Sequence, residues 1–314
     1  MTGHGGEQVA AWPRFRLADW ADVRDTVHMW TQIIGKIRMA HAPALNHWWH
    51  VTLYVSPRGL TTGSIPYRDG AFDIEFDFVD HQLHIRTSDG RRRHVALGPK
   101  PVAQFYTETM AALGELDIQT RIHAAPNEVE PAIPFAEDYV HASYDPPAVE
   151  LFWGQLLRAN RVLSEFRSGF VGKASPVHFF WGGMDLAYTR FSGRTAPPHP
   201  GGAPNCPPSV MREAYSHEVA SCGFWPGGGA EGAFYAYAYP EPPGYPEYPI
   251  RPAEACYIST GEFVLPYEVV ATAPDPDRVL TEFLQTTYTA AAELAGWDRA
   301  ALEADPHRLD RQGL

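Results

Sequence analysis

Apolar and polar residues follow two different periods along the first part of the chain. From Asp22 to Met39 apolar residues recur every three or four positions, which predicts a helix with one buried face. From Phe72 to Val79 aromatic or aliphatic residues alternate with acidic ones, which predicts a strand with one buried face. Asp89-Gly90 predicts a hairpin turn. The same reasoning predicts further strands at 47–55, 83–87, 91–97 and 118–122. It predicts a second helix at 102–116.

The second part of the chain carries the same kinds of element, with stronger helix signals and longer loops. Asp145 and Asp275 are each followed by proline, which predicts a capped helix start at both places. Strands are predicted at 184–191, 217–224, 233–239 and 254–265. Three long loops separate them, at 195–209, 226–232 and 240–252. Long loops are uncommon unless they cover a site, so we expect ordered lids.

Similar landmarks occur in the same order in both parts and predict an internal duplication. Each part has a Gly-Lys pair, a proline, a His-aromatic string and an arginine: Gly35-Lys36, Pro43, His47-Trp48-Trp49 and Arg58, then Gly172-Lys173, Pro176, His178-Phe179-Phe180-Trp181 and Arg194. The expected fold is α+β, with two related halves, each an antiparallel sheet covered by helices and joined along a groove. The expected division is an N-terminal segment 1–21, a first repeat 22–123, a connection 124–144, a second repeat 145–297 and a tail 298–314.

The composition narrows the classes of partner. With 314 residues and a net charge of −12, the chain is too acidic for the clustered cations that nucleic-acid binding requires. The basic run Arg91-Arg92-Arg93-His94 needs no such partner. Arg86, Arg92 and His94 are expected to pair across strands with three acidic residues, Asp73, Glu75 and Asp77. No secretion signal or long apolar span is recognisable, and the three cysteines are dispersed. We therefore expect a soluble, cytoplasmic protein that binds neither nucleic acid nor membrane.

No catalytic motif of known mechanism is present, so candidates come from polar residues set among aromatic ones. His178 is a candidate general base, and the alternative is a core histidine bonded to a carbonyl. Tyr215 and His217 share one face of a predicted strand, with Glu218 as a supporting group. The alternative is a purely structural pair.

Arginines at the end of the strand that follows His178 are candidates for holding an anionic group. Arg190 and Arg194 would suit a carboxylate or phosphate ester, unless they form structural salt bridges. His141 and Trp181 complete the predicted substrate-binding set. His47 and His50 lack the carboxylate or thiolate spacing of a metal site, so no metal ligands are assigned, and the cofactor and the oligomeric state remain open.

Several strings in the chain resemble a bacterial family of unknown function, domain-of-unknown-function family 5996. They are Gly35-Lys36-Ile37-Arg38, Asn46-His47-Trp48-Trp49, Arg58-Gly59-Leu60-Thr61-Thr62, Phe76-Asp77-Phe78-Val79-Asp80-His81, His141-Ala142-Ser143-Tyr144-Asp145, Ser175-Pro176-Val177-His178-Phe179-Phe180-Trp181, Thr189-Arg190-Phe191-Ser192-Gly193-Arg194 and Arg212-Glu213-Ala214-Tyr215-Ser216-His217-Glu218. The resemblance covers nearly the whole chain. It implies one integral unit and brings no activity, cofactor or catalytic residue with it.

Two functions of different classes follow from these candidates. The first is an enzyme for a small organic, anionic substrate, with the site mainly in the second repeat. The second is a non-catalytic small-molecule-binding protein with an aromatic pocket and structural histidines. A protein partner docked on the duplicated surface is a third hypothesis, which a large exposed aromatic patch would favour.

Overall fold

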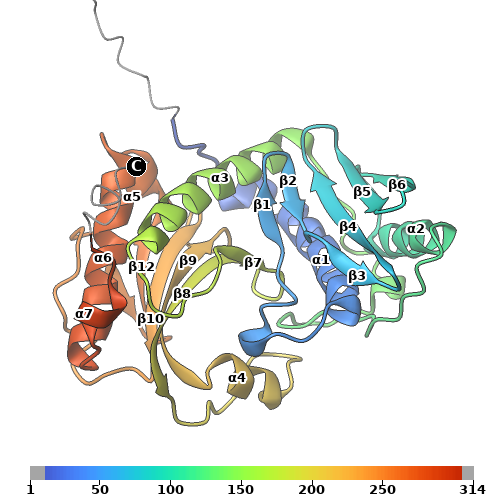
Figure 1. Ribbon diagram of the computed structural model, residues 1–314. Helices are drawn as coiled ribbons and strands as arrows, with labels where there is room; N and C mark the ends of the chain where they lie inside the picture. Colours follow the sequence, from blue (N-terminus) through green and yellow to red (C-terminus); the bar gives the residue numbers. More distant parts are fainter. Residues whose placement is uncertain (1–10, 306–314) are drawn as a thin grey trace, which may run out of the picture.

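Two antiparallel β-sheets lie side by side in the computed structural model, which describes residues 11–305 (Figure 1). Each sheet has six strands and helices packed against it, so the predicted α+β class is confirmed. Residues 1–10 of the predicted N-terminal segment and 306–314 of the predicted tail lie outside the described residues. Within residues 11–305 no helix is long and apolar enough to cross a membrane.

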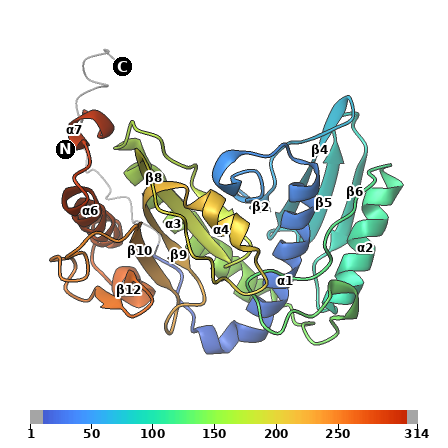
Figure 2. The same ribbon diagram turned by 90° about the horizontal axis from the view of Figure 1, so that it is seen from below.

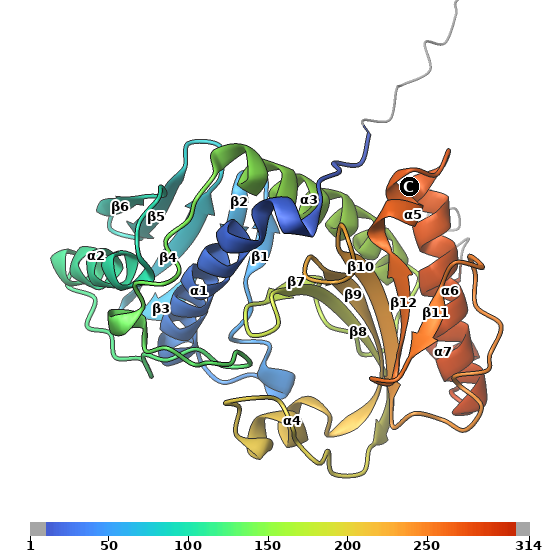
Figure 3. The same ribbon diagram turned by 180° about the vertical axis from the view of Figure 1, so that it is seen from behind.

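The first unit has its strands in the order β1-β2-β4-β5-β6, with β3 paired to β4. Helices α1 and α2 lie on one face of this sheet, in front of the strands in Figure 3 and behind them in Figure 1. The elements are α1 (Leu17–His41), η1 (Asn46–Trp48), β1 (Tyr54–Ser56), β2 (Gly59–Thr61), β3 (Ile65–Tyr67), β4 (Gly70–Asp77), β5 (Gln82–Thr87), β6 (Arg92–Ala96) and α2 (Val102–Glu115).

The second unit follows a connection that contains η2 (Phe135–Glu137), and its strands lie in the order β11-β12-β10-β9-β8-β7. Asp145 and Asp275 cap the two long helices as predicted, because each carboxylate accepts a hydrogen bond from an amide in the first turn. The elements are α3 (Pro146–Ser168), β7 (His178–Phe180), β8 (Asp185–Thr195), α4 (Pro208–Ala214), β9 (His217–Trp225), β10 (Ala233–Tyr239), β11 (Cys256–Ile258), β12 (Glu262–Pro266), α5 (Tyr267–Ala271), α6 (Pro276–Leu294) and α7 (Arg299–Leu302).

The two units are joined through their first strands and through α3. Leu53 and Phe179 exchange two backbone hydrogen bonds, of 2.9 and 2.7 Å, which link the edge near β1 to β7. Helix α3 passes over both sheets and packs against α1, β1, β8, β9 and α6 (Figures 1 and 2). The buried apolar residues form one cluster that runs through both units, so the described chain has a continuous core.

Three predicted strands differ from the structure. In place of a strand at 47–55, η1 forms a tight turn in which His47 and Trp48 have φ of 57° and 60°, and only Tyr54–Ser56 is strand. Residues 118–122 form no strand, although Ile118 is buried. The predicted strand 254–265 is a hairpin of β11 and β12, which turns at Gly261 with φ of 95°.

The two units share the succession of helix, antiparallel strands and helix that the sequence predicts, while the duplication itself stays a prediction. One pair of landmarks is not equivalent in the structure. Gly35-Lys36 lies inside α1, whereas Gly172-Lys173 lies beyond the end of α3. This difference gives Lys36 an environment that Lys173 does not share.

Candidate functional site

A cavity of about 530 Å³ lies between the two units. Helix α1 and η1 form one wall, strands β7 to β10 form the opposite wall, and the segment that carries α4 closes one side. Figure 3 shows α4 below strands β7 to β9, in the region between α1 and the second sheet. The cavity falls within the size range of small-molecule sites. Its aromatic lining comes from both units: Trp48, Trp49, Phe180, Trp181 and Phe191.

Alternation along the strands explains why one face of the second sheet is polar. On β8, Asp185 and Thr189 face the cavity, while Tyr188 and Arg190 face the helices on the other side. The same alternation on β9 and β10 turns hydroxyl groups toward the cavity, from Ser221, Tyr235 and Tyr237. The helix-covered face of the sheet therefore belongs to the core, and the other face carries the polar groups that line the cavity.

Asp185 is the carboxyl group that β8 places at the cavity. Tyr235 donates its hydroxyl hydrogen to Asp185 Oδ2. Tyr235 pairs with Gly223 of β9, and the tyrosine side chain lies over this glycine. Only glycine leaves room for it, because a Cβ at this position would lie 2.5 Å from the tyrosine oxygen. Burial raises the pKa of Asp185 to about 7. The hydrogen bond from Tyr235 lowers this pKa in part, and the negative charge of Glu128 raises it.

Glu128 brings a second carboxyl group to the same place from the connection between the units. Its left-handed backbone, with φ of 61°, and a 2.8 Å hydrogen bond from its amide to the carbonyl of Pro204 set its position. The carboxyl group lies over Gly182, where a Cβ would be 2.3 Å from Oε1. Within residues 11–305 no group donates a hydrogen bond to this carboxyl group, and desolvation raises its pKa although the side chain opens to the cavity.

Lys36 projects from the C-terminal third of α1 and is 1% exposed. Its amine donates to Asn127 Oδ1 and lies 5.4 Å from the centre of the Trp181 ring. That ring fits against α1 because the preceding residue is Gly35, where a Cβ would lie 2.1 Å from ring atoms. No carboxylate of the described chain lies within ion-pair distance of the amine. Desolvation lowers the pKa of Lys36 to about 8.

Hydroxyl groups cover the floor of the cavity in hydrogen-bonded pairs. Tyr215 and Tyr237 share a hydrogen bond of 2.7 Å, and Thr189 and Ser221 share one of 2.8 Å. Burial raises the pKa of both tyrosines, so they remain neutral donors near neutral pH. These groups could bind an oxygen or nitrogen atom of a ligand.

A second cavity, of about 680 Å³, lies beside the first and opens along β10 and β12. Its lining includes Arg24 and Asp25 of α1 and Glu262 of β12. The two cavities share the residues around the carboxyl pair: Glu128, Gly182, Gly183, Asp185, Tyr235 and Tyr237. Both carboxyl groups are therefore accessible from two sides.

Two of the eight predicted site residues line the first cavity: Tyr215 on the floor and Trp181 against Lys36. His178 is buried instead, with Nδ1 3.2 Å from the hydroxyl of Thr52 and Nε2 without a partner among the described residues. Burial lowers its pKa to about 3, and the nearby positive charge of Arg38 lowers it further. His178 is thus a neutral imidazole away from the cavity.

The other predicted residues take part in contacts outside the first cavity. Arg190 is buried beneath α3, where it donates to the carbonyl of Phe166 at 2.6 Å. Arg194 forms an ion pair of 2.7 Å with Glu218 and donates to two carbonyls at the end of α6. His217 lies 3.1 Å from the hydroxyl of Ser216, and His141 lies 2.7 Å from Asp138. The catalytic and binding roles assigned to these residues stay predictions.

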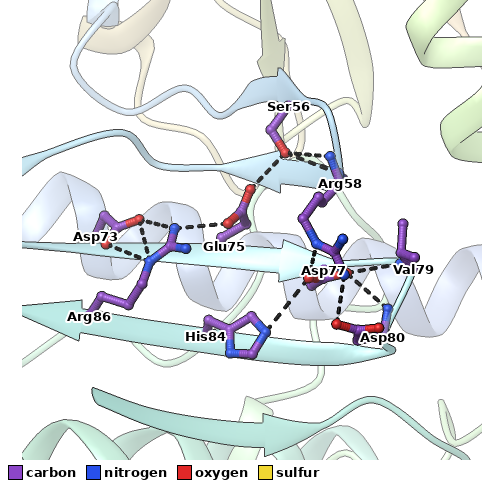
Figure 4. Close-up of polar contacts among 10 residues, drawn as sticks. Ser56, Arg58, Asp73, Glu75, Asp77, Val79, Asp80, His84 and Arg86 are labelled. Atoms are coloured by element: carbon purple, nitrogen blue, oxygen red, sulfur yellow. Dashed lines mark hydrogen bonds and ion pairs between the residues drawn. The ribbon is translucent and has the colours of Figure 1, made fainter. Parts of the chain in front are cut away.

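The open face of the first sheet shows the charge pairing that the sequence predicts for Arg86, whereas Arg91 and Arg93 of the basic run pair with Asp89, Asp117 and Glu115 instead of the acidic strand. The guanidinium of Arg86 lies 2.8 Å from Glu75 and also binds Asp73 (Figure 4). Asp77 accepts hydrogen bonds from Arg58 and from two backbone amides, and His84 lies 3.7 Å away. Burial alone would raise the pKa of Asp77, but the bonds from Arg58 and the amides outweigh it and lower that pKa.

The residues with the most distinctive contacts in this cavity were absent from the predicted site set: Lys36, Glu128, Asp185, Tyr235 and Tyr237. Two signals in the sequence point to Asp185 and to the two tyrosines. Gly182-Gly183 immediately precedes Asp185, and small residues of this kind allow another segment to approach closely. Tyr235 and Tyr237 alternate with alanine, which places two hydroxyl groups on one face of a strand. Within residues 11–305 no group of three histidine, cysteine or acidic residues is arranged to hold a metal ion.

A family model matches residues 12–304, nearly the whole chain, and its description is "Family of unknown function (DUF5996)". No curated protein and no solved structure matches the chain. The site therefore has to be interpreted from its own geometry.

Proposed function

We propose an enzymatic function for this chain, which belongs to the family of unknown function. The enzyme would transfer protons to or from a small organic molecule in the cavity between the units. One observation carries the proposal. Asp185 is held by Tyr235 in an aromatic cavity where its pKa rises to about 7. A carboxyl group with a pKa near the ambient pH can act both as a general acid and as a general base.

The neighbouring groups have distinct roles in this proposal. Tyr235 positions the Asp185 carboxyl through Oδ2, and Oδ1 would exchange a proton with a ligand. Glu128 keeps a second negative charge nearby, which favours the protonated form of Asp185. The paired hydroxyls of Tyr215 and Tyr237 would bind a polar atom of the substrate and fix its orientation.

The walls define the class of substrate. A cavity of about 530 Å³ accommodates a molecule of metabolite size, and the indole rings of Trp48, Trp49 and Trp181 favour a flat or apolar body. The carboxyl pair disfavours an anionic group next to Asp185. The anionic substrate expected from the sequence would therefore need to direct its charge away from this pair.

A second function, non-catalytic binding of a small molecule, is favoured by the aromatic lining alone. The two functions differ in what they require of Asp185. Binding to the aromatic walls would survive neutralisation of the carboxyl group, whereas proton transfer would not.

Metabolite profiling tests the proposal because it requires no choice of substrate in advance. The purified protein is incubated with a mixed metabolite extract, and the compounds that disappear or form are identified by mass spectrometry. We expect compounds that the wild type consumes and that Asp185→Asn consumes about 100-fold more slowly or not at all, the range typical of a lost general acid or base. Asp73→Asn, on the open face of the first sheet, is the matched control and should behave like the wild type.

Two results would contradict the proposal. Equal turnover by the wild type and Asp185→Asn would remove the carboxyl group from the mechanism. Compounds that bind and raise the unfolding temperature of both proteins, with no turnover by either, would establish the binding function instead.

A further inference from the structure

The amine of Lys36 has fewer partners than a buried ammonium group normally requires. An ammonium group has three donor hydrogens, and Asn127 Oδ1 is the one acceptor that the described residues provide. The side chain is 1% exposed, so bulk water does not supply the others. Burial with one acceptor and no counter-ion increases the fraction of the amine that is neutral, and a neutral amine is a nucleophile.

The position of Lys36 directs this amine to the cavity of the carboxyl pair. Lys36 lines that cavity, and Trp181, whose ring lies beside the amine, directly precedes the glycines that face Glu128 and Asp185. Asn127, which accepts the hydrogen bond from Lys36, directly precedes Glu128. Lys36 and the two acidic residues therefore line the same cavity.

We propose that Lys36 forms a covalent imine with the carbonyl carbon of an aldehyde or ketone that occupies this cavity. The inference rests on the function proposed above and specifies its substrate class. A carboxylate ligand is the competing partner for a lysine, but the ionised forms of Glu128 and Asp185 in the same cavity would repel it. A neutral carbonyl compound is not repelled.

The reaction is balanced without a further reactant. The lone pair of Nζ forms a bond to the carbonyl carbon, and the carbonyl oxygen takes up a proton to give a carbinolamine. Nitrogen then loses a proton, the C–O bond breaks, a second proton joins the departing oxygen, and water leaves. Glu128 and Asp185 face the cavity in which these protons move. The resulting iminium is a cation, and the carboxyl pair would stabilise its charge.

The lysine content of the chain makes a trapping experiment unusually clear. Lysine occurs three times among the 25 basic residues, at positions 36, 100 and 173. Lys100 pairs with Glu108 outside the cavity, and Lys173 is exposed and lies 2.8 Å from Nε2 of His47. A lysine-specific modification thus has three sites in the chain to compare.

The experiment uses the full chain, benzaldehyde as the probe and sodium cyanoborohydride, which reduces an iminium to a stable secondary amine. Peptide mapping by mass spectrometry gives the rate of modification at each lysine. We expect Lys36 to be modified about tenfold or more faster than Lys100 in the native protein, because a larger fraction of its amine is neutral. In denaturant the three rates should become similar.

Lys36→Arg should lose the fast modification, and the matched control Lys100→Arg should retain it. The wild-type comparison does not depend on whether Lys36→Arg folds. Modification of Lys36 at or below the rate of Lys100 in the native protein would overturn the imine proposal. If turnover that depends on Asp185 is still found, proton transfer stands without the imine. If Lys36 is modified but no such turnover exists, the imine site stands and the enzyme proposal fails.

Discussion

Acidic residues on the open face of the first sheet and acidic residues in the cavity lie in opposite electrostatic surroundings. Asp77 is bonded to Arg58 and to two backbone amides, and its pKa is lowered. Asp185 is bonded to a neutral tyrosine, has Glu128 nearby, and its pKa is raised to about 7. Both are aspartates on antiparallel strands with little exposure to solvent.

The comparison separates structural carboxylates from functional candidates. On the first sheet, cations compensate the charges, so ionised carboxylates contribute to stability (Figure 4). In the cavity, a carboxyl group without a cationic partner is held close to neutrality, which costs stability at higher pH and makes it available for proton transfer. Neutralising the two kinds of carboxyl group should therefore have opposite effects.

The largest effect is expected from Asp77→Ala. The substitution removes the acceptor of the amides of Val79 and Asp80 and one of the two carboxylate partners of Arg58, and Asp77 itself is 3% exposed. Because the Arg58 side chain is 43% exposed, water solvates its charge, and most of the loss comes from the two amide hydrogen bonds to the ionised carboxylate, about 3–4 kcal/mol of unfolding free energy. Urea unfolding at pH 7 measures it, and a loss below about 1 kcal/mol would show that the pairing on the first sheet does not stabilise the fold.

Gly223→Ala should come next, with a loss of about 2–3 kcal/mol from overpacking. A Cβ here would lie 2.2 Å from the carbonyl oxygen of Leu186 and 2.5 Å from the hydroxyl of Tyr235. Displacement of Tyr235 would also remove the hydrogen bond that lowers the pKa of Asp185, so that pKa should rise further. Gly63→Ala is a control for glycine replacement, because nothing lies within 4 Å of its Cβ position, although its φ of 63° adds local strain.

Asp185→Asn should stabilise the protein, in contrast to Asp77→Ala. A carboxyl group whose folded pKa exceeds its unfolded value contributes stability below about pH 4, and this contribution is lost as the pH rises to about 7. The variant and the wild type should be similar at pH 4. At pH 8 the variant should be more stable by about 1–2 kcal/mol, less than the roughly 4 kcal/mol that a pKa rise of this size gives for a fully buried group, because Asp185 is only partly buried. Thermal unfolding between these pH values measures the difference. A constant difference across the range would contradict the raised pKa of Asp185.

The smallest effect is expected from Asp80→Ala, the exposed counterpart of Asp77. Its side chain is 66% exposed and lies 2.6 Å from the same guanidinium of Arg58. Exposed ion pairs contribute about 0.2–1 kcal/mol, and salt screens them. A loss as large as that of Asp77→Ala would show that Arg58, and not burial of Asp77, dominates the network.

Local signals in the sequence predict most of the regular elements. The two Asp-Pro helix starts are correct, and the predicted strand Ala233–Tyr239 matches at both ends. The strand predicted from His47 fails because the positive φ values of His47 and Trp48 depend on contacts with α4, including a 3.0 Å bond from His47 Nδ1 to the carbonyl of Ala214. Strand propensity depends on the residues along the chain, so it does not predict a contact between segments that are distant in the sequence.

The site is less predictable because it is made from both units. The helical period of α1 predicts one buried face, yet residues 29–38 are all buried because the second unit covers the other side. Lys36 therefore has the sequence pattern of a surface residue and the environment of a core residue. Glu128 lies in a proline-rich connection without periodicity, and its partners at Gly182 and Asp185 are distant in sequence. Aromatic context identified Trp181 and Tyr215, but it also selected His178, which is in the core.

The most direct test of the account is the titration of Asp185 by ¹³C NMR of the aspartate side-chain carboxyl carbons, with Asp185→Asn to assign the resonance. The account predicts a midpoint near pH 7 for Asp185, while Asp77 titrates below the ordinary aspartate value. A midpoint for Asp185 at or below about 4, the ordinary range of an exposed aspartate, would contradict the central claim that the cavity holds a carboxyl group ready for proton transfer.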